Sequence, residues 1–130
     1  MAKVKPSAAE LEILNALWRN GPSTVNDVQA VLARGDRVAY TTVLKQLQIM
    51  FEKGLVKRDD STRPHVFRAA VAEAQVKRRV VADVLDQVFE GSAMNLVMQA
   101  LSVKRASPEE LRKLRELLDE IEDDKEGGKR

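Results

Sequence analysis

The chain has 130 residues, 44% of them hydrophobic, a formal net charge of +2 and no cysteine. This length allows one domain, or a small domain with an appendage, and the lack of cysteine excludes disulfides, thiolate metal sites and cysteine nucleophiles. Residues 1–70 carry 11 Lys/Arg against 7 Asp/Glu, a net of +4, whereas residues 71–130 carry 11 against 13, a net of −2. The basic first half is the part expected to meet a polyanion, although charge alone slightly favours an ordinary solvated surface.

The sequence gives little support to catalysis. Its single histidine, His65, has no plausible nucleophile or metal partner in the sequence, and such a histidine is far more often structural or phosphate-facing than catalytic. The carboxylates fall mostly on solvated helix faces and at helix starts, and no glycine-rich phosphate loop occurs. We therefore predict no enzyme, no metal and no cofactor. No apolar run matches a membrane span and no signal-like block follows Met1, so we expect a cytoplasmic protein without membrane insertion.

Three helices are predicted in the first 53 residues. The first begins at a capping box, Ser7 with Glu10 three residues later, and ends at the Asn-Gly-Pro of residues 20–22. The second begins at Thr24 and ends near residues 34–36. The third spans about 39–53, and Gly54 is its expected left-handed terminator.

The third helix is predicted to be amphipathic. At about 100° per residue, one arc is apolar and contains Val43, Leu44, Leu47, Met50 and Phe51. Tyr40 falls with this arc and is predicted to be a core residue. The opposite face carries Thr41, Thr42, Lys45, Gln48, Ile49 and Glu52. This outward face therefore has a single acid, near its far end.

Two short strands, at residues 55–59 and 65–69, follow the third helix and are joined by a turn at residues 60–64. Three short helices followed by a hairpin are the element order of a winged helix-turn-helix. The sequence thus predicts a mainly α fold, with an N-terminal winged helix and a small β-hairpin wing over residues 1–71.

The sequence changes character near residue 72. One long helix is predicted to end near residues 89–91, and residues 92–103 are apolar on nearly every side, so that they require burial all round. A tail of this length does not easily bury such a helix alone, which favours a second copy of the chain as its cover. Ser107, Pro108 and Glu110 start a last helix with a stripe of coiled-coil type. Residues 72–130 are predicted to form a helical dimerisation domain with a core of Val84, Val88, Met94, Val97, Met98, Leu101, Leu114, Leu117 and Ile121.

Double-stranded DNA is the predicted partner of the first domain. Short side chains at Thr41 and Thr42 allow close approach, and Lys45 and Gln46 suit guanine or adenine edges in a major groove. Phosphate contacts are assigned to Arg37, Lys57, Arg58 and Arg63, which would position the helix without specifying sequence. The alternative is a plain amphipathic helix with a solvated polar side. Likewise, Arg68 either joins the phosphate contacts or pairs with Asp59 across the hairpin.

Several segments together resemble the penicillinase-repressor family of bacterial transcription factors, the BlaI/MecI type that also contains CopY-like copper repressors. The segments that carry the resemblance are residues 10–14, 17–18, 21–22, 39–44, 53–56, 89–92 and 107–111. The resemblance covers nearly the whole chain, and the order and spacing of the segments make it specific. It implies an N-terminal winged helix, a three-helix dimerisation domain, and a homodimeric repressor that covers a dyad-symmetric operator.

The resemblance also implies a means of induction. Family members often accompany a membrane sensor metalloprotease, and cleavage in the fifth helix loosens the dimer. The matching stretch here is residues 98–101, so the candidate cleavage site is Gln99 and Ala100. The Asn-Phe pair cut in the staphylococcal-type repressors is absent, although Asn95 and Leu96 lie close by. The copper branch relies on a cysteine cluster, which this chain lacks.

Two other functions remain as alternatives. One is a protein-interaction adaptor built on a winged-helix scaffold, since fold does not fix function. An adaptor would tend to present an acidic or apolar face at residues 41–49, whereas this face has Lys45 and no acid. The other is a regulator that responds to a small molecule bound by the apolar helix at residues 92–103.

Overall fold

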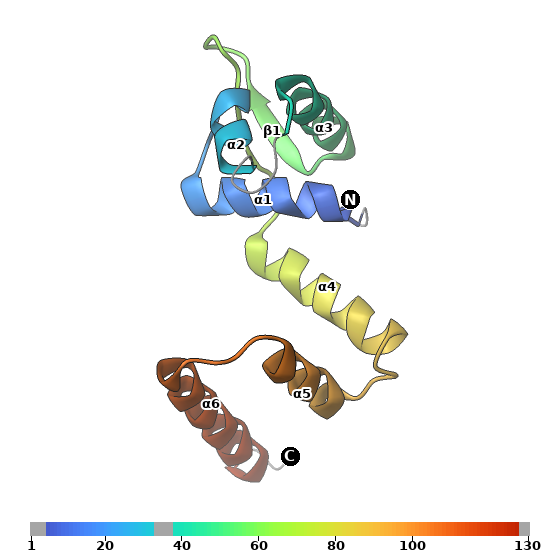
Figure 1. Cartoon of the computed structure of the whole chain (residues 1–130), viewed down its shortest axis with the longest axis vertical. Helices are drawn as coiled ribbons and strands as arrows, with labels where there is room; N and C mark the ends of the chain where they lie inside the picture. The colour runs from blue at the N-terminus through green and yellow to red at the C-terminus, as the bar shows by residue number, and fades with distance from the viewer. Residues whose placement is uncertain (1–4, 33–37, 128–130) are drawn as a thin grey trace. The chain divides into compact units, whose positions relative to one another are not determined.

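A computed structural model describes residues 5–32 and 38–127, with side chains as far as residue 124. The chain divides into two compact units, Met1–Val80 and Val81–Arg130, and the division falls within helix α4. The described elements are α1 (Ala8–Asn20), α2 (Val25–Leu32), α3 (Tyr40–Lys53), β1 (Val56–Asp59), β2 (Val66–Ala69), α4 (Glu73–Gln87), α5 (Ala93–Val103) and α6 (Pro108–Gly127) (Figure 1). This order confirms the predicted mainly α fold with a two-stranded wing. The predicted domain boundary at residues 71/72 stays a prediction.

The ends of the first three helices follow the local rules read from the sequence. At α1, the Ser7 hydroxyl accepts from the Glu10 amide and the Glu10 carboxylate accepts from the Ser7 amide, which completes the predicted capping box. Thr24 forms the same reciprocal pair with Asp27 ahead of α2. Gly54 ends α3 at φ 84° and ψ 12°, where its amide donates to the carbonyls of the last turn.

The wing is an antiparallel pair in which Val56 lies opposite Ala69 and Asp59 lies opposite Val66. Its loop spans residues 60–65 and contains a cis peptide bond before Pro64. An isolated bridge of two hydrogen bonds, 2.8 and 2.9 Å long, joins Ser23 to Phe67 and ties the hairpin to the segment before α2.

The core of the first unit lies between α1, α2, α3 and the hairpin. Its buried cluster consists of Ile13, Leu14, Leu17, Val25, Val28, Val43, Leu47, Met50, Leu55, Val56 and Phe67. The Trp18 indole, packed against this cluster, donates a 3.1 Å hydrogen bond to the Val71 carbonyl and so fixes the segment that enters α4. Three residues of the predicted third-helix arc are fully buried: Val43, Leu47 and Met50.

An ion pair with a buried carboxylate joins the start of α1 to the end of α3. The Glu10 side chain is 3% exposed, and both of its oxygens accept from Lys53 Nζ, at 2.8 and 3.1 Å. Burial raises the pKa of Glu10, but the hydrogen bonds from Lys53 and Ser7 outweigh it and hold the pKa below its ordinary value. The charged form of Glu10 is therefore the form that stabilises the fold.

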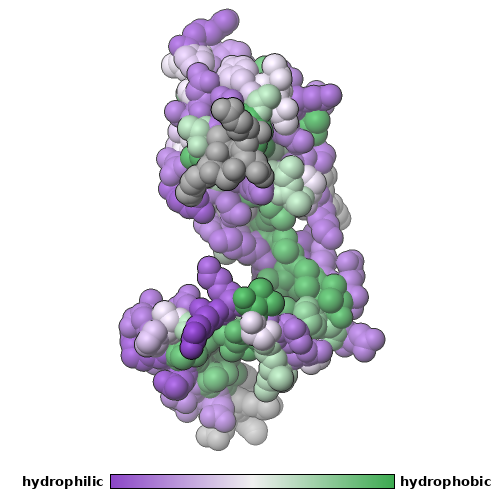
Figure 2. Space-filling model, viewed as in Figure 1, coloured by the Kyte–Doolittle hydropathy of each residue, from purple (hydrophilic) through white to green (hydrophobic). Residues whose placement is uncertain are grey.

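The described residues of the second unit include no buried core. None of the described residues of α4 and α5 is buried, and the same holds for α6 as far as residue 124. Large apolar side chains are exposed instead, above all Val103 (84%), Met94 (69%), Val88 (65%), Leu118 (61%) and Met98 (60%). Figure 2 shows the resulting hydrophobic surface on this unit. Within the described ranges, no helix has the length and apolar character needed to cross a membrane.

Candidate nucleic-acid interface

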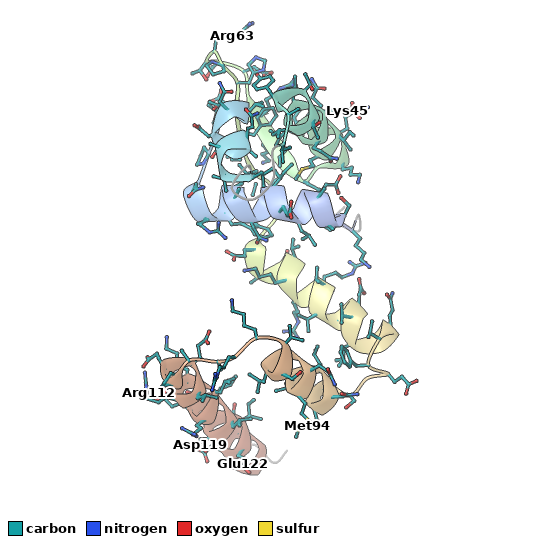
Figure 3. All side chains as sticks on the ribbon, in the orientation of Figure 1. Lys45, Arg63, Met94, Arg112, Asp119 and Glu122 are labelled. Atoms are coloured by element: carbon teal, nitrogen blue, oxygen red, sulfur yellow. The ribbon has the colours of Figure 1, made fainter. Side chains whose placement is uncertain are left out.

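Helix α3 presents the outward face that the sequence predicted. Thr41, Thr42 and Lys45 are exposed, and Figure 3 shows the Lys45 side chain pointing away from the core. Gln46 is only half-buried, because it lies between this face and the apolar arc. Glu52 is the single acid on the face and lies near its C-terminal end. The first turns of α3 are thus open to a polyanion.

The N-terminus of α3 is itself suited to an anion. Its N-cap is Ala39, which makes no side-chain cap, and its first turn contains no acid. The Thr42 amide donates to the Ala39 carbonyl at 3.1 Å, whereas the Tyr40 and Thr41 amides, together with the positive end of the helix dipole, suit a phosphate. The Gln29 side chain of α2 donates a 2.9 Å hydrogen bond to the Val38 carbonyl, which fixes the chain just before the helix starts. Arg37, a predicted phosphate contact, lies outside the described residues.

The prediction that Tyr40 belongs to the core is wrong, since its side chain is 41% exposed. Tyr40 is the first residue of α3, so no preceding helical turn covers it, and the helical arc alone does not decide its burial. It lines a small groove of about 90 Å³ between α3 and the hairpin, together with Gln48, Arg58 and His65. Sequence reasoning missed Tyr40 as a surface group beside Thr41.

The two faces of the wing divide its basic residues. Lys57 lies opposite Arg68 on the outer face, and both are exposed. Arg63 is exposed in the loop, where Figure 3 shows it at the tip of the hairpin. Arg58 shares the other face with Val56 and the buried Phe67. Lys57 and Arg58, which are neighbours in the sequence, therefore point in opposite directions.

Arg58 has two partners inside the chain. Its guanidinium lies 4.5 Å from the centre of the Phe51 ring on α3. Its Nε lies 2.7 Å from Asp60 Oδ1, although the N–H does not point at that oxygen as in a hydrogen bond. The Arg58 side chain is only 29% exposed. Sequence reasoning assigned Arg58 to the phosphates, although the alternation of β1, with Val56 facing inward, could have placed it on the inner face.

The acids of the wing are also engaged locally. Hydrogen bonds from the Ser61 hydroxyl (2.6 Å) and amide (2.9 Å) lower the pKa of Asp59, and the charge of Arg68 adds to this effect. Among the described residues no ion pair joins Asp59 to Arg68, so the cross-strand pair considered from the sequence does not form. Arg68 is thereby left on the same outer face as Lys57. Asp60 Oδ1 also lies 3.5 Å from His65 Nδ1.

The residues predicted to form the dimer core are mostly exposed in the single chain. Val84 and Leu114 are half-buried, and the other seven, from Val88 to Ile121, are between 41% and 69% exposed. The candidate cleavage residues Gln99 and Ala100 lie exposed within α5. No cluster of three or more metal-ligating side chains occurs in the part of the chain that the structure describes.

A three-helix unit with an open reading face on α3 and a basic β-hairpin beside it defines a winged-helix transcriptional regulator. The chain belongs to the penicillinase repressor family, whose model matches residues 6–120. This membership confirms the family resemblance and the prediction that the chain is not an enzyme. The chain is a DNA-binding repressor by family and fold.

Individual relatives are distant but extend over nearly the full chain. The penicillinase repressor of Staphylococcus aureus is 20% identical over 119 residues, which cover 92% of this chain and 94% of that protein. The transcriptional regulator BlaI of Mycobacterium tuberculosis is 30% identical over 114 residues, or 87% and 82% of the two chains. Among solved structures, the transcriptional regulator Tm0710 of Thermotoga maritima is similar in fold, with a TM-score of 0.51 at 18% identity, covering 94% of this chain and 77% of that one.

Proposed function

We propose that the chain is a homodimeric repressor that binds a dyad-symmetric operator through two α3 helices and two wings. The observation that carries the proposal is the open first half of α3. Thr41, Thr42 and Lys45 are exposed beside an uncapped helix N-terminus that has no acid in its first turn. This face of α3 is neither acidic nor apolar, as the surface of a protein-interaction adaptor would tend to be.

Within this proposal, the residues of α3 read bases and those of the wing bind phosphates. Thr41, Thr42, Lys45 and Gln46 make base or close backbone contacts in the major groove. Lys57 and Arg63 neutralise phosphates from the outer face and the tip of the wing. A twofold-symmetric dimer would place its half-sites about one helical turn apart, or a multiple of it.

The exposed apolar surface of the second unit supports the dimer. Helix α5 carries Met94, Val97, Met98 and Leu101, all at least 41% exposed, and none of its residues is buried. A helix with apolar residues all round requires a cover, and contiguous exposed apolar surface marks an interaction site. A second copy of the chain supplies apolar faces of the same kind, as twofold interfaces require.

Release of the operator is proposed to follow cleavage of α5 at Gln99 and Ala100 by a membrane sensor protease. The support is their position in the helix that matches the family's cleavage segment and their exposure in the single chain. Mass spectrometry of the repressor after co-expression with such a protease would show a break at residues 99–100. Intact chain together with a derepressed gene would exclude this route.

The experiment that tests DNA reading uses fluorescence anisotropy with a duplex that the protein enriches from a random-sequence library. Lys45→Ala should weaken binding to the enriched duplex by about 1–3 kcal/mol and change the preferred sequence. Arg63→Ala should weaken binding to enriched and random DNA alike and reduce the salt slope by about one unit. Lys113→Ala removes the same charge from α6 and serves as the control. Parental affinity in Lys45→Ala would refute α3 as the reading helix.

A further inference from the structure

The inner face of the wing holds a contact that joins it to α3. Arg58 extends from β1 across to the last turn of α3, where its guanidinium covers the Phe51 ring at 4.5 Å. Phe51 is 40% exposed, so its ring is available to this partner at the edge of the core. A planar guanidinium stacks on an aromatic face in a way that an ammonium does not reproduce.

Asp60 connects the same guanidinium to the wing loop. Its Oδ1 lies 2.7 Å from Arg58 Nε, at the start of the loop, and 3.5 Å from His65 Nδ1, at the end of the loop. Both ends of the loop therefore meet at one carboxylate, and Arg58 carries this junction onto α3. Arg58 also lines the groove between α3 and the hairpin, which holds only about 90 Å³.

These contacts leave Arg58 poorly placed to neutralise a phosphate. Its charge is already balanced by Asp60 and its side chain is 29% exposed, whereas Lys57 on the opposite face of the same strand is exposed. A phosphate would have to displace Asp60 and uncover Phe51 to reach it. We propose that Arg58 is a positioning residue: it holds the wing at a fixed angle to α3, so that Lys57 and Arg63 reach the phosphates beside the bases that α3 reads. This inference rests on the proposed DNA-binding function.

The binding test compares two variants with a control on the same strand. Arg58→Lys keeps the charge but loses the stack, and should lower affinity for the enriched duplex about two- to thirtyfold with the salt slope unchanged. Phe51→Leu should have a similar effect, and the double variant should lose little more, because both changes break one contact. Lys57→Ala should instead reduce the salt slope by about one unit. The proposal would be overturned if Arg58→Lys bound the enriched duplex as tightly as the parent, or if Arg58→Ala reduced the salt slope by about one unit. Arg58 would then be a phosphate contact.

A second measurement needs no DNA and so separates this inference from the proposed function. In the NMR spectrum of the free protein, the ring current of Phe51 should shift the Arg58 side-chain protons upfield, and Phe51→Leu should abolish that shift. The heteronuclear NOE of the backbone amides of residues 61–63 should fall in Arg58→Lys and Phe51→Leu while the melting temperature stays close to that of the parent. An unchanged loop in both variants would overturn the positioning role, even if the wild-type protein binds its operator tightly. Absence of specific binding by the wild type would refute the proposed function, and the NOE would still decide the role of Arg58.

Discussion

Truncation of Met98 should weaken the dimer by an amount that follows from its exposure. Met98 lies on α5 and is 60% exposed in the single chain. Complete burial of such a side chain is worth about 1.5–3 kcal/mol, so covering the exposed part contributes about 1–2 kcal/mol in each protomer. Twofold symmetry counts the residue twice, about 2–4 kcal/mol in total, and Met98→Ala should therefore raise the dimer dissociation constant about 30- to 900-fold.

Sedimentation equilibrium over a range of protein concentrations measures this change directly. The neighbouring exposed residue Gln99, changed to Ala, is the matched control, because it removes a polar side chain from the same turn of α5. Helix content by circular dichroism should be unchanged in both variants. If the parent formed a tight dimer and Met98→Ala dimerised equally tightly, the exposed face of α5 would not be the interface. A monomeric wild-type protein at high concentration would refute the dimer itself.

Two predictions concern the stability of the first unit. Glu10→Gln should lower the free energy of unfolding by about 1.5 kcal/mol, the low end for hydrogen bonds to a charged group, because the Lys53 side chain is 36% exposed. Since folding lowers the pKa of Glu10, its contribution is complete above its ordinary value of 4.5 and is lost as the pH falls through the lower folded value. Urea unfolding from neutral to acidic pH should thus show the gap between parent and variant closing below pH 4.5; a constant gap would contradict the ion pair. Gly54→Ala should cost about 1–2 kcal/mol, because φ is +84° while an added Cβ meets no atom within 4 Å, so backbone strain is the whole effect. Gly54→Asn should cost less when both variants are unfolded with urea at neutral pH, and equal costs would show that strain is not the cause.

The local features of the first unit could be predicted because they depend on residues close in the sequence. Capping at Ser7 and Thr24 depends on side chains within about one helical turn, and termination at Gly54 depends on the backbone of that residue and of the last turn. The wheel of α3 identified its buried centre for the same reason. The predicted burial of Tyr40 was wrong because burial at a helix end depends on what packs beyond that end, and not only on the helical arc.

The arrangement around Arg58 was not predicted because it combines strand register with a distant helix. Grouping Lys57 with Arg58 as two basic neighbours ignored the alternation of side chains along a strand. That alternation was visible in the sequence, since Val56 and Arg58 must share a face. The stack on Phe51 was not, because it depends on how the hairpin packs against α3. The pairing of Asp60 with Arg58 likewise follows from the loop conformation.

For the second unit, periodicity predicted the helices but not their environment. Helix α5 lies within the predicted residues 92–103, and α6 begins after the predicted start at Ser107. Burial of their apolar residues, by contrast, depends on a partner that one sequence does not specify. Because Met94 and Met98 are exposed in the single chain, we predict that a second copy of the chain covers them.

The proposed function depends above all on sequence-specific DNA binding, which one titration measures directly. The wild-type protein is titrated by fluorescence anisotropy against the duplex it enriches from a random library and against unselected duplex, at several salt concentrations. We predict that the enriched duplex contains two inverted half-sites and binds about a thousandfold or more tightly than unselected DNA, with a steep salt slope. Failure to enrich any sequence, or equal and weak binding to both duplexes, would contradict it.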